Sequence, residues 1–286
     1  MVAPDRTVRG KALTTYDDFS RGILAGIEQR NVSDLVPRQA LVEIDERVDH
    51  AGSVVVPLDE AAVASAAKRL VEEEGIEAIA LCFLNSHLNP EHERRARQIV
   101  GAQYPDLFTC SGSDVFPVRG ETRRWTTAVL NCFVHSEARG YLDSVSRNLR
   151  AAGLRSEPVF FQGVGGGISR ERAGDAPLAL LGSGPAAGAN GANALARRMG
   201  VDRVLVGDMG GAGFDTGVIV GNEVRTTKNI EIGPFLTGVN LVDVVSVGAG
   251  GGSIAWVGYA AGGPAQRVLH AGTGGARAGW HRSHGH

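Results

Sequence analysis

Apolar residues recur every three or four positions in several stretches of the chain, and shorter runs that are apolar throughout separate these stretches. Residues 57–75, PLDEAAVASAAKRLVEEEG, begin with acidic residues and end at a glycine, so they predict a helix. Residues 89–104 predict a second helix with Pro90 in its first turn, and a third, longer helix is expected over 121–153. Residues 76–85, IEAIALCFLN, lie between the first two helices and predict a buried strand.

Further apolar runs lead into glycine-rich turns. Residues 39–52 alternate like a strand that enters a turn at Gly52, and residues 14–29 predict a short amphipathic helix. Strands that alternate with helices in this way are typical of an α/β domain with a partly parallel sheet. The later stretches that pair an apolar run with a glycine turn are 158–167, 180–200, 204–221 and 244–257.

Composition and charge narrow the class of protein. The 286 residues suffice for one large or two ordinary domains, and 29 basic against 31 acidic residues argue against a nucleic-acid-binding surface. No apolar run approaches the roughly 18 residues of a membrane span, and no signal peptide opens the chain. The three cysteines, Cys82, Cys110 and Cys132, are widely spaced and indicate neither a disulfide framework nor a zinc site. We therefore expect a cytoplasmic protein whose thiols are reduced and buried.

Most of the 40 glycines follow residue 150, and they gather in four clusters. A glycine turn at the end of a strand lets backbone N–H groups converge on an anion, and a helix that starts there adds its positive end. One such loop is explained as well by an ordinary turn, so the indication of a phosphate site comes from the set. The clusters lie at residues 163–167, 182–191, 207–217 and 248–252.

The cluster in VLVGDMGGAGFDTGVIVG, residues 204–221, also carries two aspartates at the ends of its turn. Two interpretations stay open. In the first, the segment is an ordinary β-hairpin in which Asp208 and Asp215 cap the turn. In the second, the glycines leave room for a phosphate, and a carboxylate holds Mg²⁺ that bridges the phosphate oxygens.

This stretch resembles the phosphate-binding hairpin D-M-G-G-T-S-T-D of the hydantoinase A family. That family includes ATP-dependent N-methylhydantoinases, 5-oxoprolinases and subunits of acetone and acetophenone carboxylases. The resemblance covers roughly residues 10–258, and the similar segments follow in the family's order. They are ERVDHAGSVVVPLDE, FLNSHLNPEHERRA, LGSGPAAGANGANALA and VGAGGGSIAWV.

The resemblance implies an α/β actin-like ATPase fold, in which two lobes with glycine-rich phosphate hairpins close over a nucleotide. It implies ATP and Mg²⁺ as cofactors and a small cyclic amide or carbonyl compound as substrate, which is activated by phosphorylation. It also implies a second, B-type hydantoinase subunit as partner. A sugar-kinase-like enzyme of the same fold fits the order of the motifs less well.

Residue by residue, the resemblance assigns Asp208 and Asp215 to catalysis and Asp208 to the metal. The turn matched to the family's Q-S-N-G-G is assigned to the substrate and consists of Gln162, Gly165 and Gly166. The residues assigned to phosphate and adenosine are Gly210, Gly211, Gly182, Ser183, Gly184, Gly188, Gly248, Gly250, Gly251, Gly252 and Ser253.

The sequence departs from the family pattern at the hairpin itself. Ala212, Gly213 and Phe214 stand where the family has hydroxyl residues, so donors to phosphate are lost and a bulky ring is expected at an anion site. The asparagine of Q-S-N-G-G is Val164, and the histidine of a D-x-H pair is Val245.

The family's first-lobe hairpin D-V-G-G-T-F-T-D has no counterpart before Lys11, and a segment with H-G-T-T-V-A-T-N is absent as well. We therefore expect a truncated chain that does not turn over ATP unaided, because phosphoryl transfer depends on charge stabilisation from both lobes. The rival hypothesis is a non-catalytic remnant that binds a partner subunit. Exposed sheet edges would make such a chain self-associate into a homo-oligomer.

The expected domains are a remnant of the N-terminal lobe over 1–115, the first part of the hydantoinase A domain over 116–258, and a tail over 259–286. The tail is rich in Gly, Arg and His, lacks a hydrophobic period, and reads like a family segment in a shifted frame, so we expect disorder there. Two histidines, His87 and His92, and the arginines Arg119, Arg123 and Arg124 are expected to be solvated.

Overall fold

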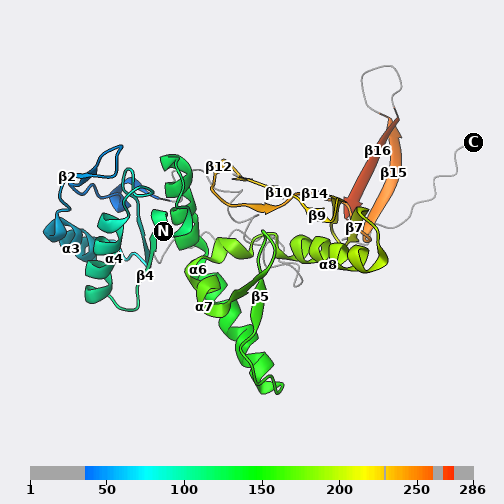
Figure 1. Cartoon of the computed structure of the whole chain (residues 1–286), viewed down its shortest axis with the longest axis horizontal. Coiled ribbons are helices and arrows are strands. Elements are labelled where there is room, and N and C mark those ends of the chain that lie inside the picture. The colour runs from blue at the N-terminus through cyan, green and yellow to red at the C-terminus, as the bar shows by residue number, and fades with distance from the viewer. Residues whose placement is uncertain (1–35, 229, 260–266, 274–286) are drawn as a thin grey trace, which may run out of the picture. The chain divides into compact units, whose positions relative to one another are not determined.

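A computed structural model describes residues 36–228, 230–259 and 267–273 of the chain (Figure 1). The chain divides into two compact units, and each is described by itself. Unit 1 consists of Met1–Ala187 and Thr226–Val242, and unit 2 consists of Gly188–Arg225 and Asp243–His286. The predicted helix over residues 14–29 lies outside the described residues.

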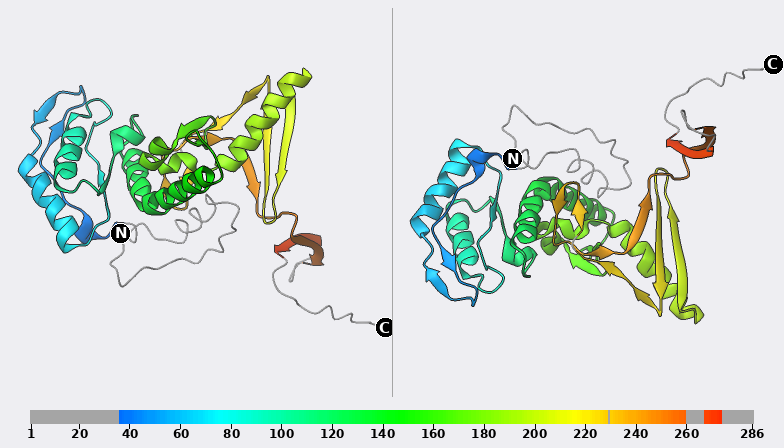
Figure 2. Two further views of the ribbon diagram at one scale, coloured as in Figure 1. Left: turned by 90° about the horizontal axis from the view of Figure 1, so that it is seen from below. Right: turned by 90° about the horizontal axis from the view of Figure 1, so that it is seen from above.

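Unit 1 begins with a small α/β arrangement in which two parallel strands pack beside helices (Figures 1 and 2). Strand β3 (Ala78–Leu81) pairs in parallel with β4 (Phe108–Ser111), as the alternation of strands and helices predicts. The other elements of this part are η2 (Arg38–Ala40), the antiparallel pair β1 (Arg47–Val48) and β2 (Val54–Val56), α3 (Glu60–Lys68), η3 (Arg69–Glu73), α4 (Glu91–Gln103) and α5 (Gly112–Val115).

The two predicted helices in this part are confirmed, and the local sequence explains where the first one begins and ends. Asp59 precedes α3, and its carboxylate accepts a hydrogen bond from the backbone N–H of Ala62 at 2.9 Å. The helix continues into the π-helical turn η3 and stops before Gly75, whose φ of +65° suits a glycine. Together α3 and α4 cover the strands around an apolar core of Val63, Ala67, Leu70, Ile76, Ile79, Leu81, Ala96 and Val100.

The rest of unit 1 is organised around the predicted long helix, which is confirmed as α6 (Glu121–Ala151). One side of α6 contacts β3 and β4, and the helix also packs against α7 and η4. Its apolar residues join the core cluster of Leu130, Val134, Leu178, Leu181, Ile232, Phe235 and Val239. The other elements are β5 (Val159–Phe161), β6 (Gly167–Ser169), α7 (Arg170–Asp175), η4 (Pro177–Leu180), β10 (Thr226–Thr227), β11 (Glu231–Ile232), β12 (Phe235–Leu236) and β13 (Leu241–Val242).

Unit 2 contains a small antiparallel sheet in the order β14-β8-β7, with β9 also paired to β8. Helix α8 (Ser183–Met199) begins in unit 1 and continues into unit 2, where its buried side chains include Ala189 and Ala196. A separate antiparallel pair, β15 and β16, follows the sheet. The strands are β7 (Arg203–Met209), β8 (Phe214–Val220), β9 (Glu223–Val224), β14 (Val244–Val247), β15 (Ser253–Tyr259) and β16 (Arg267–Thr273).

The sheet of unit 2 has two different faces. Helix α8 runs along one face, where Ile219 is 1% exposed and the Asn193 side chain donates to the carbonyl of Asn222 at 3.0 Å (Figure 2). The register places Leu205 opposite Val218, so both point to the other face. That second face exposes six large apolar side chains: Leu205, Met209, Val218, Val220, Val245 and Val247.

The compact units have other bounds than the expected domains, which stay a prediction. Strand β4, helix α5 and helix α6 belong to one compact unit, so the expected boundary between 115 and 116 does not coincide with the division between the units. The tail was expected to lack regular structure, but residues 267–273 form β16, while 260–266 and 274–286 lie outside the described residues. Among the helices that the structure describes, none has both the length and the apolar character of a membrane span.

Candidate functional site

The predicted hairpin over residues 204–221 is confirmed as β7 and β8. Asp208 and Asp215 lie directly opposite each other in the register of the two strands, so both carboxylates are on the same face of the sheet. That is the face along which α8 runs, because Oδ2 of Asp208 lies 3.6 Å from the position that a Cβ would take on Gly188. At the tip of the hairpin, the N–H of Gly210 donates to the carbonyl of Gly213 at 2.9 Å.

The glycine loop that precedes β15 docks on this tip, backbone against backbone. The N–H of Gly251 donates to the carbonyl of Gly210, and the N–H of Gly252 donates to the carbonyl of Gly211, both at 2.9 Å. A Cβ on Gly250 would lie 2.5 Å from the carbonyl oxygen of Gly210, so only a glycine fits without a shift of the backbone. The structure thus brings together two of the four glycine clusters.

The docked tip keeps backbone donors available. The carbonyls of Gly210 and Gly211 are both used as acceptors, whereas the N–H groups of Gly211 and Ala212 donate to no residue that the structure describes. Adjacent free N–H groups in a turn form a concave binding site for an anion. The tip therefore has two adjacent backbone donors and lacks the hydroxyls that the family hairpin adds.

The two carboxylates have different surroundings. Asp215 is only 8% exposed, and its Oδ1 accepts a hydrogen bond from the hydroxyl of Ser246 on the neighbouring strand β14. Asp208 is exposed, and its carboxylate accepts no hydrogen bond from the residues that the structure describes. The exposed carboxylate is thus the one that solvent, a cation or a ligand reaches.

Ser253 closes the docked loop upon itself. Its hydroxyl accepts a hydrogen bond from the N–H of Gly250 at 3.0 Å, and its own N–H donates to the carbonyl of Gly250 at 2.9 Å. Gly248, at the start of the loop, has open space where a Cβ would be. The assignment of Gly248 and Ser253 to a ligand stays a prediction, and the contacts of Ser253 show what holds the loop in shape.

The expectation that Phe214 brings its ring to the anion site is wrong. Phe214 is opposite Met209 in the register, on the face away from the two aspartates. Its ring packs over Gly207, where a Cβ would lie 3.1 Å from the ring. The glycine at 207 makes room for the ring, so the carboxylate face stays clear of it.

The cluster at 163–167 lies in unit 1, and the cluster at 182–191 begins in unit 1 and continues into unit 2 at Gly188. The turn from β5 to β6 is closed by hydrogen bonds from the N–H of Gln162 to the carbonyl of Gly166 and from the N–H of Gly165 to the carbonyl of Gln162, both at 2.9 Å. The side-chain amide of Gln162 donates to the carbonyl of Gly167 at 3.2 Å, within the same turn. Gly182 has a φ of +65° directly before α8, which confirms that this helix starts inside the glycine run.

Gly163 is a close-contact position that the sequence reasoning missed. Its N–H donates to the carbonyl of Ala179 and its carbonyl accepts from the N–H of Val242, both at 2.8 Å. A Cβ there would lie 1.7 Å from the carbonyl oxygen of Leu181, so the three backbone segments cross too closely for any side chain. The glycine run itself was visible in the sequence, but which glycine sits at the crossing depends on contacts distant along the chain.

A buried charged cluster at the carboxyl ends of β3 and β4 also escaped prediction. Arg124 and Glu93 are both 0% exposed, although Arg124 was expected to be solvated. The Glu93 carboxylate accepts hydrogen bonds from the N–H groups of Phe83 at 3.0 Å and Ser113 at 2.8 Å. The guanidinium of Arg124 donates to the carbonyl of Val118 at 3.1 Å. Helical spacing was a usable signal, because Arg124 falls on the same stripe as the buried residues Thr127, Ala128, Asn131, Val134, Ala138 and Leu142.

His92 was also expected to be solvated, but it is buried. It is 7% exposed, and its Nδ1 lies 2.7 Å from Oε2 of Glu46, whose side chain is also buried. His87 is half-buried, and burial together with the positive charge of Arg124 lowers its pKa. No group of three or more His, Cys, Asp or Glu side chains is arranged to hold a metal ion in the part of the chain that the structure describes.

The three cysteines come close together in unit 1. Cys110 on β4 is 3% exposed, Cys82 follows β3, and Cys132 lies on α6; all three are free thiols. Burial raises the pKa of Cys82, and a hydrogen bond with the Cys110 thiol, together with burial, raises the pKa of Cys132. Protonated thiols are poor nucleophiles, and Cys110 is the small core group that was expected, whereas Cys82 and Cys132 are only partly buried.

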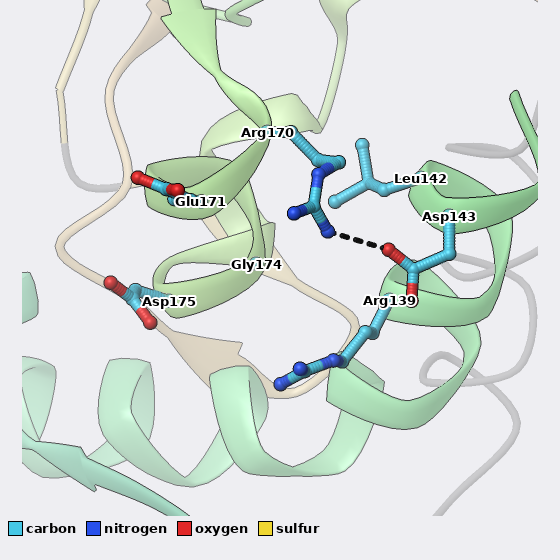
Figure 3. Close-up of a pocket in the computed structure, with 7 residues that line it drawn as sticks. All are labelled: Arg139, Leu142, Asp143, Arg170, Glu171, Gly174 and Asp175. Carbon is cyan, nitrogen blue, oxygen red and sulfur yellow. Dashed lines mark hydrogen bonds and ion pairs between the residues drawn. The ribbon is translucent and has the colours of Figure 1, made fainter. Parts of the chain in front are cut away.

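A pocket of about 160 Å³ lies between α6 and α7, and none of the residues assigned to a ligand lines it (Figure 3). Its lining is mainly charged, and Arg170 donates to the carboxylate of Asp143 across it at 2.7 Å. The full lining is Arg139, Leu142, Asp143, Arg170, Glu171, Gly174 and Asp175. A partly exposed ion pair of this kind is common on protein surfaces and does not by itself indicate a ligand.

Comparisons with known proteins identify the class. The model of the Hydantoinase/oxoprolinase family matches residues 124–264, and that of the Hydantoinase/oxoprolinase N-terminal region matches residues 4–103. The chain therefore belongs to the hydantoinase/oxoprolinase family. Its fold is the α/β actin-like ATPase fold of that family, of which it holds a part.

Particular relatives add detail. The chain is 36% identical to the caprolactamase subunit alpha of Pseudomonas jessenii over 77% of this chain and 32% of that protein. It is 31% identical to the acetophenone carboxylase gamma subunit of Aromatoleum aromaticum over 80% of this chain and 33% of that one. The nucleotide-free structure of acetone carboxylase superposes with a TM-score of 0.66 at 29% identity, over 83% of this chain and 33% of that chain. The chain thus spans about a third of the length of these relatives.

Proposed function

We propose that this chain supplies the glycine-rich phosphate site of an ATP-dependent subunit that opens a cyclic amide. The observation that carries the proposal is the docking of the Gly250–Gly252 loop on the hairpin tip, beside two paired carboxylates. The caprolactamase of Pseudomonas jessenii is ATP-dependent, and its alpha subunit is similar to this chain. That kinship supports a lactam as the substrate class.

The residues present fit a phosphate and its Mg²⁺. The free N–H groups of Gly211 and Ala212 serve as neutral donors to phosphate oxygens. The exposed carboxylate of Asp208 is suited to hold Mg²⁺, directly or through water, because Mg²⁺ prefers oxygen ligands and keeps part of its water shell. When bound, ATP would supply the phosphoryl group that activates an amide carbonyl.

Two loops of unit 1 are also assigned to ligands. We assign Gly182, Ser183 and Gly184 at the start of α8 to phosphate or adenosine, since a helix N-terminus favours a negative charge. The turn of Gln162, Gly165 and Gly166 is assigned to the substrate. Its glycines adopt φ values of +95° and +83°, which residues other than glycine disfavour.

A second candidate is a carboxylase subunit that phosphorylates a carbonyl substrate. The relatives named acetophenone carboxylase and acetone carboxylase favour it at similar identity. The two candidates share the phosphate site and differ in the substrate, so a comparison of a lactam with a ketone as activator of ATP hydrolysis distinguishes them.

A third candidate is a chain that has lost catalysis and binds a B-type subunit. The absence of hydroxyls at Ala212 and Gly213 favours it, because phosphate loses two donors there. The relatives are named as subunits of larger enzymes, which supports a partner surface that persists without chemistry.

Calorimetric titration with Mg-ATP tests the proposal. We expect binding in the wild type, a loss of at least tenfold in affinity in Asp208→Asn, and no change in the control Asp202→Asn, whose side chain is exposed on the same unit. Ala212→Thr should tighten binding relative to the isosteric Ala212→Val, since only threonine restores a hydroxyl. No heat and no thermal shift at millimolar Mg-ATP would overturn the proposal in favour of the partner-binding candidate.

A further inference from the structure

Ser246 on β14 contacts one of the two hairpin carboxylates, that of Asp215. It is opposite Asp215 in the register of β14 and β8, so its side chain points to the same face of the sheet as both aspartates. Its hydroxyl donates to Oδ1 of Asp215. Asp208, one strand further along, receives no such bond within the described residues.

The bond restricts Asp215 in two ways. A carboxylate that accepts from a hydroxyl has one oxygen committed, and at 8% exposure this side chain has little room to change its rotamer. Two like charges directly opposite each other in a β-ladder repel, and the hydroxyl dipole directs part of the charge of Asp215 away from Asp208. Asp208 is thereby left as the carboxylate with both oxygens free.

We propose that Ser246 is a positioning residue of the phosphate site: its hydroxyl holds Asp215 in place so that Asp208 alone takes the cation that accompanies the phosphates. This inference rests on the proposed function, because it concerns the same hairpin. It assigns different roles to the two aspartates, which the motif D-x₆-D does not distinguish. Asp215 orders the site, and Asp208 contacts the metal.

The neighbouring Thr216 provides a matched control. Its hydroxyl donates to the carbonyl of Val245 at 3.4 Å, and its register position opposite Gly207 places it on the other face of the sheet. Removing that hydroxyl changes a weak bond of the same sheet without touching either aspartate. Any general effect of losing a β-sheet hydroxyl is therefore measured by Thr216→Val.

The first experiment tests the positioning role on the whole chain with Mn²⁺-ADP as the probe. Electron paramagnetic resonance reports free and bound Mn²⁺ in the wild type, Ser246→Thr, Ser246→Val and Thr216→Val. Threonine and valine have the same shape, so only the hydroxyl separates the two Ser246 variants. We expect wild-type affinity in Ser246→Thr and Thr216→Val and a loss of roughly tenfold in Ser246→Val. Equal affinity in Ser246→Thr and Ser246→Val overturns the inference and leaves the proposed function standing.

The second experiment separates the failure of this inference from the failure of the proposed function. A double-mutant cycle in urea unfolding combines Ser246→Val with Asp215→Asn, and separately with Asp208→Asn. We expect a non-additive effect with Asp215 and an additive one with Asp208. Additivity in both cycles overturns the bond itself. A non-additive cycle with Asp215 in a chain that binds no Mn²⁺-ADP shows that the bond exists, while it overturns the proposed function and with it the role of Ser246 in cation binding.

Discussion

Two regions of this protein hold loops in place by opposite means. At the carboxyl ends of β3 and β4, a buried carboxylate and a buried guanidinium bind backbone groups: Glu93 accepts from the N–H of Phe83, and Arg124 donates to the carbonyl of Val118. At the hairpin of unit 2, the loops contact each other through glycine backbone alone. The first arrangement depends on two charged side chains, and the second depends on the absence of any.

The difference shows how each region tolerates change. A buried charge loses its compensation when a partner is removed, so the β3–β4 region is sensitive to the loss of side chains. The glycine contacts use no side chains, so the removal of side chains does not weaken them. An added methyl group blocks them, so the hairpin region is sensitive to the gain of a side chain. The region held by glycines is also the one with free N–H groups, which a ligand can use.

The largest effect is expected from Glu93→Ala. The N–H groups of Phe83 and Ser113 lose their acceptor. The fully buried Arg124, whose side chain lies beside Gly112 as that of Glu93 does, loses an opposite charge. We expect a loss of about 3–5 kcal/mol in the free energy of unfolding of unit 1, measured by urea denaturation. Glu91→Ala, an exposed glutamate on the same helix, is the control and should change it by less than about 0.5 kcal/mol. Equal effects of the two would show that the buried carboxylate contributes no stability.

The second prediction adds a methyl group to the docked loop. In Gly250→Ala the new Cβ would lie 2.5 Å from a backbone oxygen, so the loop must move and the two hydrogen bonds to the hairpin tip weaken. We expect about 1–3 kcal/mol of destabilisation in unit 2 and faster amide exchange at Gly251 and Gly252, which hydrogen exchange with mass spectrometry detects. Gly248→Ala, where a Cβ meets open space, should leave both unchanged.

The third prediction concerns pH and falls on α6 of unit 1, where the ring of His135 stacks on that of Phe108. Burial lowers the pKa of His135 from the ordinary value of 6.5, against a partly opposing hydrogen bond with the carbonyl of Gly174. The folded state therefore binds fewer protons than the unfolded state, so stability is fully present above about pH 6.5 and falls as the pH decreases below it. Urea midpoints of unit 1 at pH 7.5 and pH 5.5 should differ less in His135→Gln than in the wild type. An unchanged difference would exclude His135 as the source.

The smallest effect on folding is expected on the exposed apolar face of the unit 2 sheet. Leu205 is 78% exposed and Val245 is 63% exposed, on the face opposite α8. Leu205→Lys combined with Val245→Lys should change the unfolding free energy by less than about 0.5–1 kcal/mol but reduce self-association. Sedimentation velocity at increasing protein concentration measures the self-association, and Leu195→Lys on α8 is the control. Equal association of all three proteins would contradict a role for this face in a homo-oligomer.

The sequence predicted the parts of this structure that depend on local pattern. Helices α3, α4, α6 and α8 and the β7–β8 hairpin follow from hydrophobic period, acidic first turns and glycine stops, which act within a few residues. The site was predicted as a set of glycines, but their partners were not. The bonds of Gly251 and Gly252 to the hairpin tip join segments about forty residues apart, and backbone contacts have no residue pattern of their own.

The errors have a common physical origin. The sequence-based expectations followed the usual preference of each residue type. Arg124 and His92 were expected in water because they are polar or charged, and Phe214 was expected at the turn because it occurs there in the sequence. Arg124 and His92 are buried because backbone carbonyls or the Glu46 carboxylate receive their hydrogen bonds. The ring of Phe214 lies away from the aspartates because the alternation of β8 turns it to the other face, where Gly207 leaves space. Tertiary partners decided all three positions.

The docking of one glycine loop on another also affects whether this contact produces correlated substitutions among homologous sequences. Pairs of positions that touch through side chains leave a statistical trace in families, since a change on one side favours a compensating change on the other. Gly250 and Gly210 touch through atoms that every amino acid possesses, and Gly250 has no permitted alternative that a change at Gly210 could accommodate. Methods that infer contacts from correlated substitutions should therefore miss the junction at the proposed phosphate site, and they should detect the cluster around Glu93 and Arg124 more readily.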